Sequence, residues 1–321
     1  MKRLKVKNDF IFRKLFGDAE NKDILISFLN AVLELSDSKQ LTDIELVDGT
    51  SLKKDSPEDK LGILDIRART ALGENINIEV QLINQYNMDK RTLFYWAKLF
   101  AEQLKEGQPY NDLKKTITIN ILDFNYIDTE QYSTAFHLWE DKDRSCKLTD
   151  VLEIRFLELP KFRKKQPDLS KPLDRWLVFI EDSPEEVREM AKKQEPAIAR
   201  AEEVLERLGS FNEIRRYYES REMAIHDEVT RLTGARAEGI EEGIAKGIVE
   251  GIAKGIEEGR AEGIAKGRAE GIAKGRAEGI AKGRAEGIAE IARSLLDILD
   301  DRTISEKTGL AIEEVAKLRL Q

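Results

Sequence analysis

A glycine falls at every fourth position from Gly239 to Gly287, and this run limits most strongly what the chain can fold into. The mature unit is Gly-Ile-Ala-Lys-Gly-Arg-Ala-Glu, and residues 234–293 hold eleven basic and eleven acidic side chains. Such a low-complexity repeat is typical of a helical tail. Most aromatic residues and the patterns typical of strands lie before residue 186, so the main folded domain is predicted there.

The repeat has the spacing of a helix whose stability is doubtful in isolation. Lys266, Glu270, Lys274 and Glu278 are each four residues apart, so each can pair with the next. Each glycine costs about 1 kcal/mol relative to alanine, and such pairs recover only a few tenths each. Close packing against another helix would compensate, with a right-handed supercoil because the repeat exceeds 3.6 residues. A semi-flexible spacer and a homo-oligomer strip both stay open.

Composition excludes several classes of protein. No apolar run reaches the length of a membrane helix, and no apolar stretch of a signal peptide follows the basic N-terminus. Cys146 is the single cysteine, and the two histidines, His137 and His226, are far apart. We therefore expect a cytoplasmic protein without a membrane partner, whose catalysis would use carboxylates, amides, Lys and Arg. The net charge of -8 argues against a protein that coats nucleic acid, but not against a nuclease with local basic patches.

Four regions differ in composition and sequence pattern: residues 1–185, 186–233, 234–292 and 293–321. The first mixes amphipathic helices with alternating strands, so its class is α/β or α+β. The second reads as a helical connector and the third is the repeat. In the fourth, Ile304–Val315 resembles a helix-turn-helix with Gly309 at the turn. The second helix would present Glu313 and Glu314, so a role in packing or self-association is at least as well supported as DNA binding.

A hairpin in the first region carries the candidate site. Residues 75–82 and 64–69 alternate strictly, which places Glu79 and Gln81 on one face of their strand and Asp65 and Arg67 on one face of theirs. If the loop is Leu72–Glu74, Asp65 lies opposite Gln81, Arg67 lies opposite Glu79, and the two carboxylates are diagonal neighbours. Two carboxylates at that separation can share one divalent cation, which is what Mg²⁺-assisted phosphodiester hydrolysis needs.

Several stretches in order resemble one known family. They are Asn8–Gly17, Leu64–Ile66, Ile78–Gln81, Arg91–Leu99 and Gly107–Tyr110. Asp65, Glu79 and Gln81 look like the PD-(D/E)XK nuclease signature, and the whole set resembles the recombination-promoting nuclease family, often described as transposases. The resemblance covers roughly residues 5–250. It implies a restriction-endonuclease-like mixed sheet flanked by helices and metal-dependent cleavage of DNA.

The resemblance also implies roles for individual residues. Asp65 and Glu79 would bind Mg²⁺ or another divalent cation together with the Val80 carbonyl, and Gln81 would orient water or phosphate. Asp9 is a candidate third acid. Gln81 stands where the signature usually has Lys, so the rate is expected to be low unless a cation such as Arg67, Arg69 or Lys90 substitutes. Arg91 and Tyr95, one helical turn apart, are candidates for phosphate contact.

Each candidate also has a plain structural explanation. Asp65 and Glu79 could lie on a solvated sheet face beside Arg67 and Arg69, and Asp9 could simply favour the dipole of its helix. Phe94, Trp96 and Phe100 are predicted to be core residues. The basic run Lys161–Lys165 could follow a DNA backbone, although a solvated charge run is the commoner explanation. The leading hypothesis is a metal-dependent DNA endonuclease linked to recombination, mobile elements or phage defence. The alternative is a catalytically weak or inactive DNA-binding or assembly protein on the same fold.

Overall fold

The structure is a computed structural model, and it describes residues 3–47, 66–84 and 86–320. The chain divides into two compact units between Gly234 and Ala235, and each unit is described by itself. Within the described ranges, no helix has the length and apolarity required to span a membrane.

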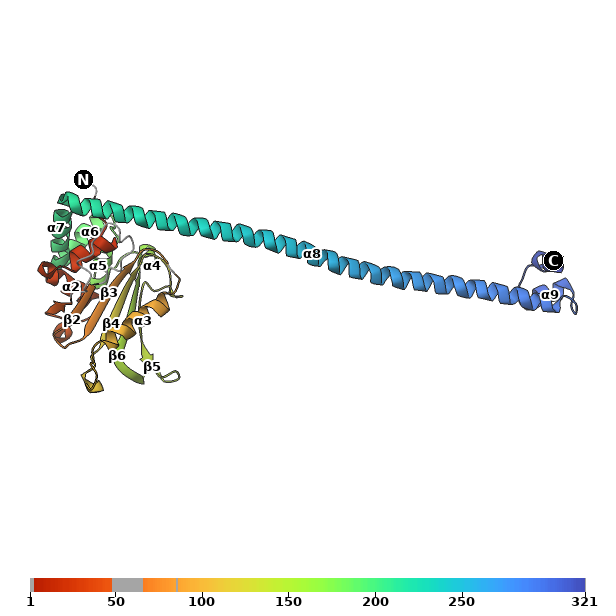
Figure 1. The fold of residues 1–321 in the computed structure, drawn as a ribbon, viewed down its shortest axis with the longest axis horizontal. Coiled ribbons are helices and arrows are strands. Elements are labelled where there is room, and N and C mark those ends of the chain that lie inside the picture. Colours follow the sequence, from red (N-terminus) through yellow and green to blue (C-terminus); the bar gives the residue numbers. More distant parts are fainter. Residues whose placement is uncertain (1–2, 48–65, 85, 321) are drawn as a thin grey trace. The chain divides into compact units, whose positions relative to one another are not determined.

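A mixed sheet of six strands is the centre of the first unit as described, with strand order β1-β2-β3-β4-β6-β5 (Figure 1). The central pairs β3–β4 and β4–β6 are parallel, and the other pairs are antiparallel. The predicted α/β class with a mixed sheet is therefore confirmed. The strands are β1 (Ile44–Leu46), β2 (Ile66–Thr70), β3 (Asn75–Gln81), β4 (Thr116–Leu122), β5 (Ser133–Trp139) and β6 (Lys147–Glu158).

One face of the sheet forms the main core with most of the helices. An aromatic cluster of Phe12, Phe16, Phe28 and Trp176 packs there with ring centroids 4.4–6.0 Å apart. Because α6 and α7 contribute buried side chains to this core, they are part of the compact unit. The helices are α1 (Asp9–Phe16), α2 (Lys22–Val32), α4 (Leu159–Arg163), α5 (Pro172–Ile180), α6 (Glu185–Gln194) and α7 (Pro196–Ser210), with short 3-10 turns η1 (Ala19–Asn21), η2 (Asp37–Lys39) and η4 (Tyr110–Asp112).

The helix α3 (Met88–Ala101) lies against β4, on the other face of the sheet (Figure 1). It buries only Met88 and Thr92, while Trp96 is half-buried and donates its indole N–H to the Thr116 carbonyl at 2.8 Å. These residues are four apart and define the inward stripe of the helix. Phe94 lies two residues from that stripe, on the outer side, and is 66% exposed. Its prediction as a core residue was wrong.

The hairpin between β2 and β3 has a register two residues from the predicted one. Arg67 pairs with Asn77, not with Glu79, and Arg69 pairs with Asn75. The Thr70 amide donates to the Glu74 carbonyl, so the three-residue loop is Ala71–Gly73. Gly73 has φ +82°. A three-residue hairpin loop ends in this left-handed conformation, which glycine adopts without strain, so Gly73 sets the position of the loop.

The second unit contains the repeat and the C-terminal helices. The helix α8 (Asn212–Leu295) includes the whole repeat. Apart from the adjacent backbone of the helix itself, no described atom lies within 4 Å of a Cβ placed on any glycine from Gly239 to Gly287. The predicted spacing of ion pairs is present, with Lys246–Glu242 at 2.7 Å and Lys266–Glu262 at 3.1 Å. The helices α9 (Asp301–Thr308) and α10 (Ile312–Arg319) turn at Gly309 and form a small apolar cluster with the end of α8.

Candidate active site

Glu79 is a buried carboxylate near the carboxyl end of a central strand. It lies on β3 beside Asn120 of the parallel strand β4, on the sheet face that α3 covers, and it is 2% exposed. The explanation of Glu79 as part of a solvated face is therefore wrong. A carboxylate is buried at a cost unless charged or hydrogen-bonding groups compensate it, so its partners decide its role.

One oxygen of Glu79 is fixed by two neighbouring side chains. Its Oε1 accepts from the Arg91 guanidinium at 2.7 and 3.1 Å and from the Gln81 amide at 2.5 Å. The Arg91 guanidinium also lies over the Tyr95 ring, 5.5 Å from its centroid. The structure therefore brings four predicted site residues into one chain of contacts, Gln81–Glu79–Arg91–Tyr95. Arg91 positions the carboxylate in this arrangement.

The other oxygen of Glu79 belongs to an under-satisfied polar layer. Glu79 Oε2 is buried and has no hydrogen-bond partner among the described residues, and the same holds for both amide atoms of Asn77, Thr118 Oγ1 and Asn120 Oδ1. These residues form the register pairs Asn77–Thr118 and Glu79–Asn120 on β3 and β4. Buried polar groups normally have a partner, so a ligand, ion or water is expected in this layer.

The donor set at Glu79 fits one side of a divalent cation site. Oε2 is a buried carboxylate oxygen without a partner in the described part of the chain, and carboxylate oxygens are the ligands that hard cations prefer. Among the described residues, no group of three or more His, Cys, Asp and Glu side chains is placed to hold a metal ion. Asp65, the predicted second ligand, lies outside the described residues. Val80, the predicted carbonyl ligand, pairs with Ile121 in the sheet.

Asp9 is held by a residue from the far side of the sequence. Its carboxylate accepts from Arg221 of α8 through Nε at 2.9 and 3.0 Å and through Nη2, and both side chains are mostly buried. Next to it, the Asn8 amide donates to Glu222 at 3.0 Å. The two consecutive pairs attach the first turn of α1 to α8. The structure gives Asp9 this structural contact and shows no contact between Asp9 and Glu79 in the described residues.

The predicted substitute cations have different surroundings. Arg67 is half-buried and lines a small hollow of about 150 Å³ with Leu99 and Gln103 of the α3 segment. Arg69 lies 3.9 Å from Glu45. Lys90 is exposed in the first turn of α3. Arg67 and Lys90 therefore flank the α3 face of β2 and β3.

Three residues of the basic run Lys161–Lys165 have partners within the protein. Lys161 is bound to Glu158 at 2.6 Å, Arg163 to Asp123 and to Glu181 at 2.5 Å, and Lys165 lies over the Tyr132 ring. Burial raises the pKa of Glu181, although Lys7 and Arg163 oppose this. Arg163, Lys164 and Lys165 are exposed, as a solvated run predicts, whereas Lys161 is mostly buried beside Glu158.

Comparison with known proteins identifies the family. The profile described as "PD-(D/E)XK nuclease family transposase" matches residues 6–235. The chain belongs to this family. The match includes the whole described sheet, the Glu79 site and the first turns of α8. Neither the curated proteins nor the solved structures provide a significant match. Family membership supports nuclease chemistry in this domain.

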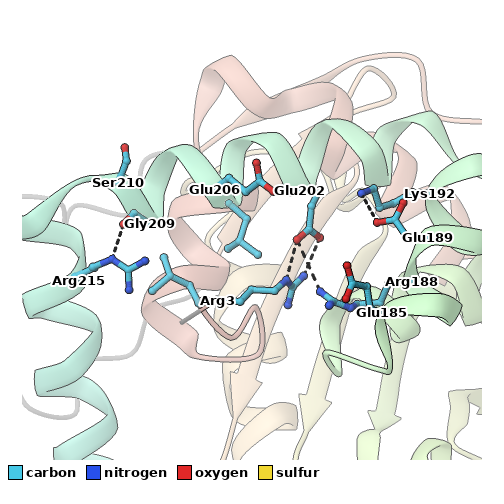
Figure 2. Close-up of a pocket in the computed structure, with 12 residues that line it drawn as sticks. Arg3, Glu185, Arg188, Glu189, Lys192, Glu202, Glu206, Gly209, Ser210 and Arg215 are labelled. Atoms are coloured by element: carbon cyan, nitrogen blue, oxygen red, sulfur yellow. Dashed lines mark hydrogen bonds and ion pairs between the residues drawn. The ribbon is translucent and has the colours of Figure 1, made fainter. Parts of the chain in front are cut away.

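A second hollow, of about 390 Å³, lies between the N-terminal segment and α6, α7 and α8 (Figure 2). Several of its charged groups pair with each other: Arg3 binds Glu202 at 2.8 Å, Arg188 lies 3.8 Å from Glu202, and Lys192 binds Glu189. Ion pairing lowers the pKa of Glu202 although burial opposes this. Self-paired charges of this kind join helices, so we assign this hollow no catalytic role.

Sequence reasoning missed the polar layer and the partner of Asp9. The layer has a signal in the sequence, since Asn77 and Glu79 alternate with apolar residues in one strand and Thr118 and Asn120 do so in another. Two such strands in parallel register put their polar side chains on one face. No sequence pattern indicates that Arg221 contacts Asp9, because the two residues are 212 positions apart.

Proposed function

We propose that this protein is a metal-dependent DNA endonuclease whose catalytic centre is built on Asp65, Glu79 and Gln81. The observation that carries the proposal is Glu79, a buried carboxylate. Arg91 and Gln81 fix one of its oxygens, and the other has no partner among the residues that the structure describes. A carboxylate so held is costly for stability alone and suits cation binding. Its position within the nuclease family match supports the same chemistry.

Asp65 and Glu79 would hold the cation, with the Val80 carbonyl as a further ligand. Mg²⁺ in such a site stabilises charge on the phosphate and makes a bound water nucleophilic. Arg91 keeps the Glu79 carboxylate in one orientation, and the Gln81 amide, 2.5 Å from Glu79, would orient water or phosphate beside it. The Tyr95 ring packs against the Arg91 guanidinium. We propose that Arg91 and Tyr95 contact the substrate phosphate only after this arrangement opens.

The proposed centre has glutamine at position 81 where the nuclease signature usually has lysine, and this is expected to lower its rate of cleavage. An amide at position 81 orients by hydrogen bonding but adds no positive charge to the transition state. Arg67 is the proposed substitute, since it is half-buried on the strand next to Glu79. Asp9 is left out of the catalytic set, because its carboxylate is bound by Arg221.

Cleavage of supercoiled plasmid tests this proposal. Full-length protein is incubated with Mg²⁺ or with EDTA, beside Asp65→Asn and Glu79→Gln variants whose circular dichroism matches the wild type. Glu153→Gln is the matched control, because it removes another buried carboxylate on the opposite face of the sheet. Metal-dependent cutting lost in the first two variants and kept in the control supports the proposal. Wild-type protein that binds but never cuts DNA would favour the alternative, an inactive binding or assembly protein.

The role of the enzyme in recombination, mobile elements or defence is part of the same proposal, and it is supported by the transposase description of the family. Activity in such processes would require cutting of DNA in cells. A strain that overproduces the wild type should therefore accumulate DNA breaks, and one that overproduces Glu79→Gln should not.

We also propose that the repeat lets two copies associate. Along α8, Ile264, Ile272 and Ile280 are each about 60% exposed, and the glycines between them leave room for close approach of a second helix. Replacing these three isoleucines by glutamate should lower the mass measured by sedimentation to that of a monomer. Replacing Lys266, Lys274 and Lys282 by glutamine is the control, and an equal effect of both sets would contradict the proposal.

A further inference from the structure

Two aromatic side chains next to the candidate site are exposed without a core role. Tyr86 and Phe94 are each 66% exposed, and they lie five residues before and three residues after Arg91. Leu93, beside Phe94, is 50% exposed. Large apolar side chains that stay exposed near a candidate site are a reason to ask what they bind.

Phe94 is connected to the catalytic carboxylate by a series of direct contacts. Its ring meets the Tyr95 ring edge to face at 5.7 Å, Tyr95 lies beneath the Arg91 guanidinium, and Arg91 binds Glu79 at 2.7 Å. The surface that Phe94 exposes is therefore continuous with the groups proposed to act on the phosphate.

Tyr86 is presented in a conformation that costs free energy. Its φ is +57°, in the left-handed region that a tyrosine rarely adopts, and its amide donates to Asn84 Oδ1 at 2.8 Å. The loop thus holds an aromatic ring in solvent only five residues after Gln81. A strained residue beside a candidate site is a reason to ask what function the strain serves.

The charge around these rings suits an anionic partner. The exposed stripe of α3 carries Lys90 one turn before Phe94 and Lys98 one turn after it. Lys98 lies 3.9 Å from Glu102, a long ion pair on the exposed side of the helix. Aromatic faces between cations are what proteins use to bind single-stranded nucleic acid, because bases stack on the rings while cations contact the backbone.

We infer that Phe94 and Tyr86 stack on unpaired bases of the DNA beside the scissile phosphate, so that the enzyme prefers single-stranded or gapped DNA over continuous duplex. This inference rests on the proposed function only in taking DNA as the substrate. A base enclosed in a duplex does not expose its face, so stacking of this kind discriminates between the two forms.

Binding, measured without cleavage, tests the inference separately from the endonuclease activity. Fluorescence anisotropy of a labelled single strand and of its matched duplex is recorded with full-length protein carrying Glu79→Gln. Phe94→Ala should weaken binding to the single strand roughly 5- to 100-fold and leave duplex binding unchanged. Tyr86→Ala should act in the same direction. Tyr110→Ala is the control, because Tyr110 is 84% exposed at the opposite end of β4 and should change neither affinity.

Rescue variants separate stacking from general apolar contact. Phe94→Trp should keep the single-strand preference, whereas Phe94→Leu should lose it. Quenching of a 2-aminopurine base in the strand should disappear with Phe94→Ala. Equal losses on both DNA forms, or no loss on either, would overturn the inference. So would a change from dimer to monomer on Phe94→Ala in sedimentation, since the occupant of the surface would then be a second copy. Loss of plasmid cutting alone would bear only on the proposed function.

Discussion

The pairing of Asp9 with Arg221 predicts a stability defect where the family resemblance suggested a catalytic acid. The Asp9 and Arg221 side chains are 12% and 14% exposed, and Arg221 Nε donates to both carboxylate oxygens at 2.9 and 3.0 Å. Breaking a fully buried pair by removing one partner costs about 3–5 kcal/mol, and the remaining exposure reduces this to about 2–3 kcal/mol. We therefore expect Asp9→Asn to lower the free energy of unfolding of the first unit by about 2–3 kcal/mol.

A double-mutant cycle measures the pair itself. Asp9→Asn, Arg221→Gln and the double variant are unfolded in urea and followed by tryptophan fluorescence, in which Trp176 of the core reports on the packing of α1 and α2. The expected coupling is about 2 kcal/mol, since hydrogen bonds to a charged partner contribute about 1.5–3 kcal/mol. DNA cleavage per folded molecule should stay at the wild-type level in all three. The reasoning would be refuted if the stability losses of the two single variants added up to that of the double variant. It would also be refuted if a stably folded Asp9→Asn variant no longer cleaved DNA.

Three further predictions concern other parts of the chain. Gln81→Lys should raise kcat for plasmid cleavage by about ten- to a hundredfold, because it returns a cation to the phosphate; an unchanged rate would mean that another cation already acts there. Glu153→Gln should be less stable than wild type near neutral pH. Burial opposes the charged form of Glu153, but Lys115 and Arg155 outweigh it and hold its pKa below 4.5, so the stability is present above pH 4.5 and the difference should shrink as pH falls below it. Urea midpoints across pH measure this, and a constant difference would contradict it. Arg319→Ala should destabilise the C-terminal unit by about 1 kcal/mol, because Arg319 donates to the carbonyls of Leu296 and Leu299 at the end of α8; hydrogen exchange in α9 and α10 should rise, and unchanged protection would contradict the assignment.

The helices and strands of the first unit could be predicted from the sequence more reliably than which side of each element is buried. The alternation of Asn75–Gln81 identified the strand, but it could not show that α3 would cover the polar side. The polar residues are buried because β3 is a central strand with a helix on each face, which depends on partners distant in sequence. The same limit made Phe94 look like core, since composition does not tell which side of a helix meets a sheet.

The register of the hairpin was decided by one residue. A loop at Leu72–Glu74 and one at Ala71–Gly73 satisfy the alternation equally, because a shift of two preserves the faces. Gly73 chooses between them through its positive φ, and the cross-strand partner of Arg67 becomes Asn77. The contact of Glu79 with Arg91 was not predicted, because no spacing rule relates a strand to the following helix. The domain boundaries and the role of Asp65 stay predictions.

Cation binding at Glu79 is the central claim, and titration with Mn²⁺ tests it most directly. Electron paramagnetic resonance of free Mn²⁺, with Mg²⁺ as competitor, counts the bound ions in full-length wild type, Glu79→Gln and the control Glu153→Gln, all of confirmed fold. The account predicts a Mn²⁺ site that Mg²⁺ displaces, that is lost in Glu79→Gln and that is kept in Glu153→Gln. Wild-type protein that binds no Mn²⁺, or Glu79→Gln that binds it as tightly as wild type, would contradict it.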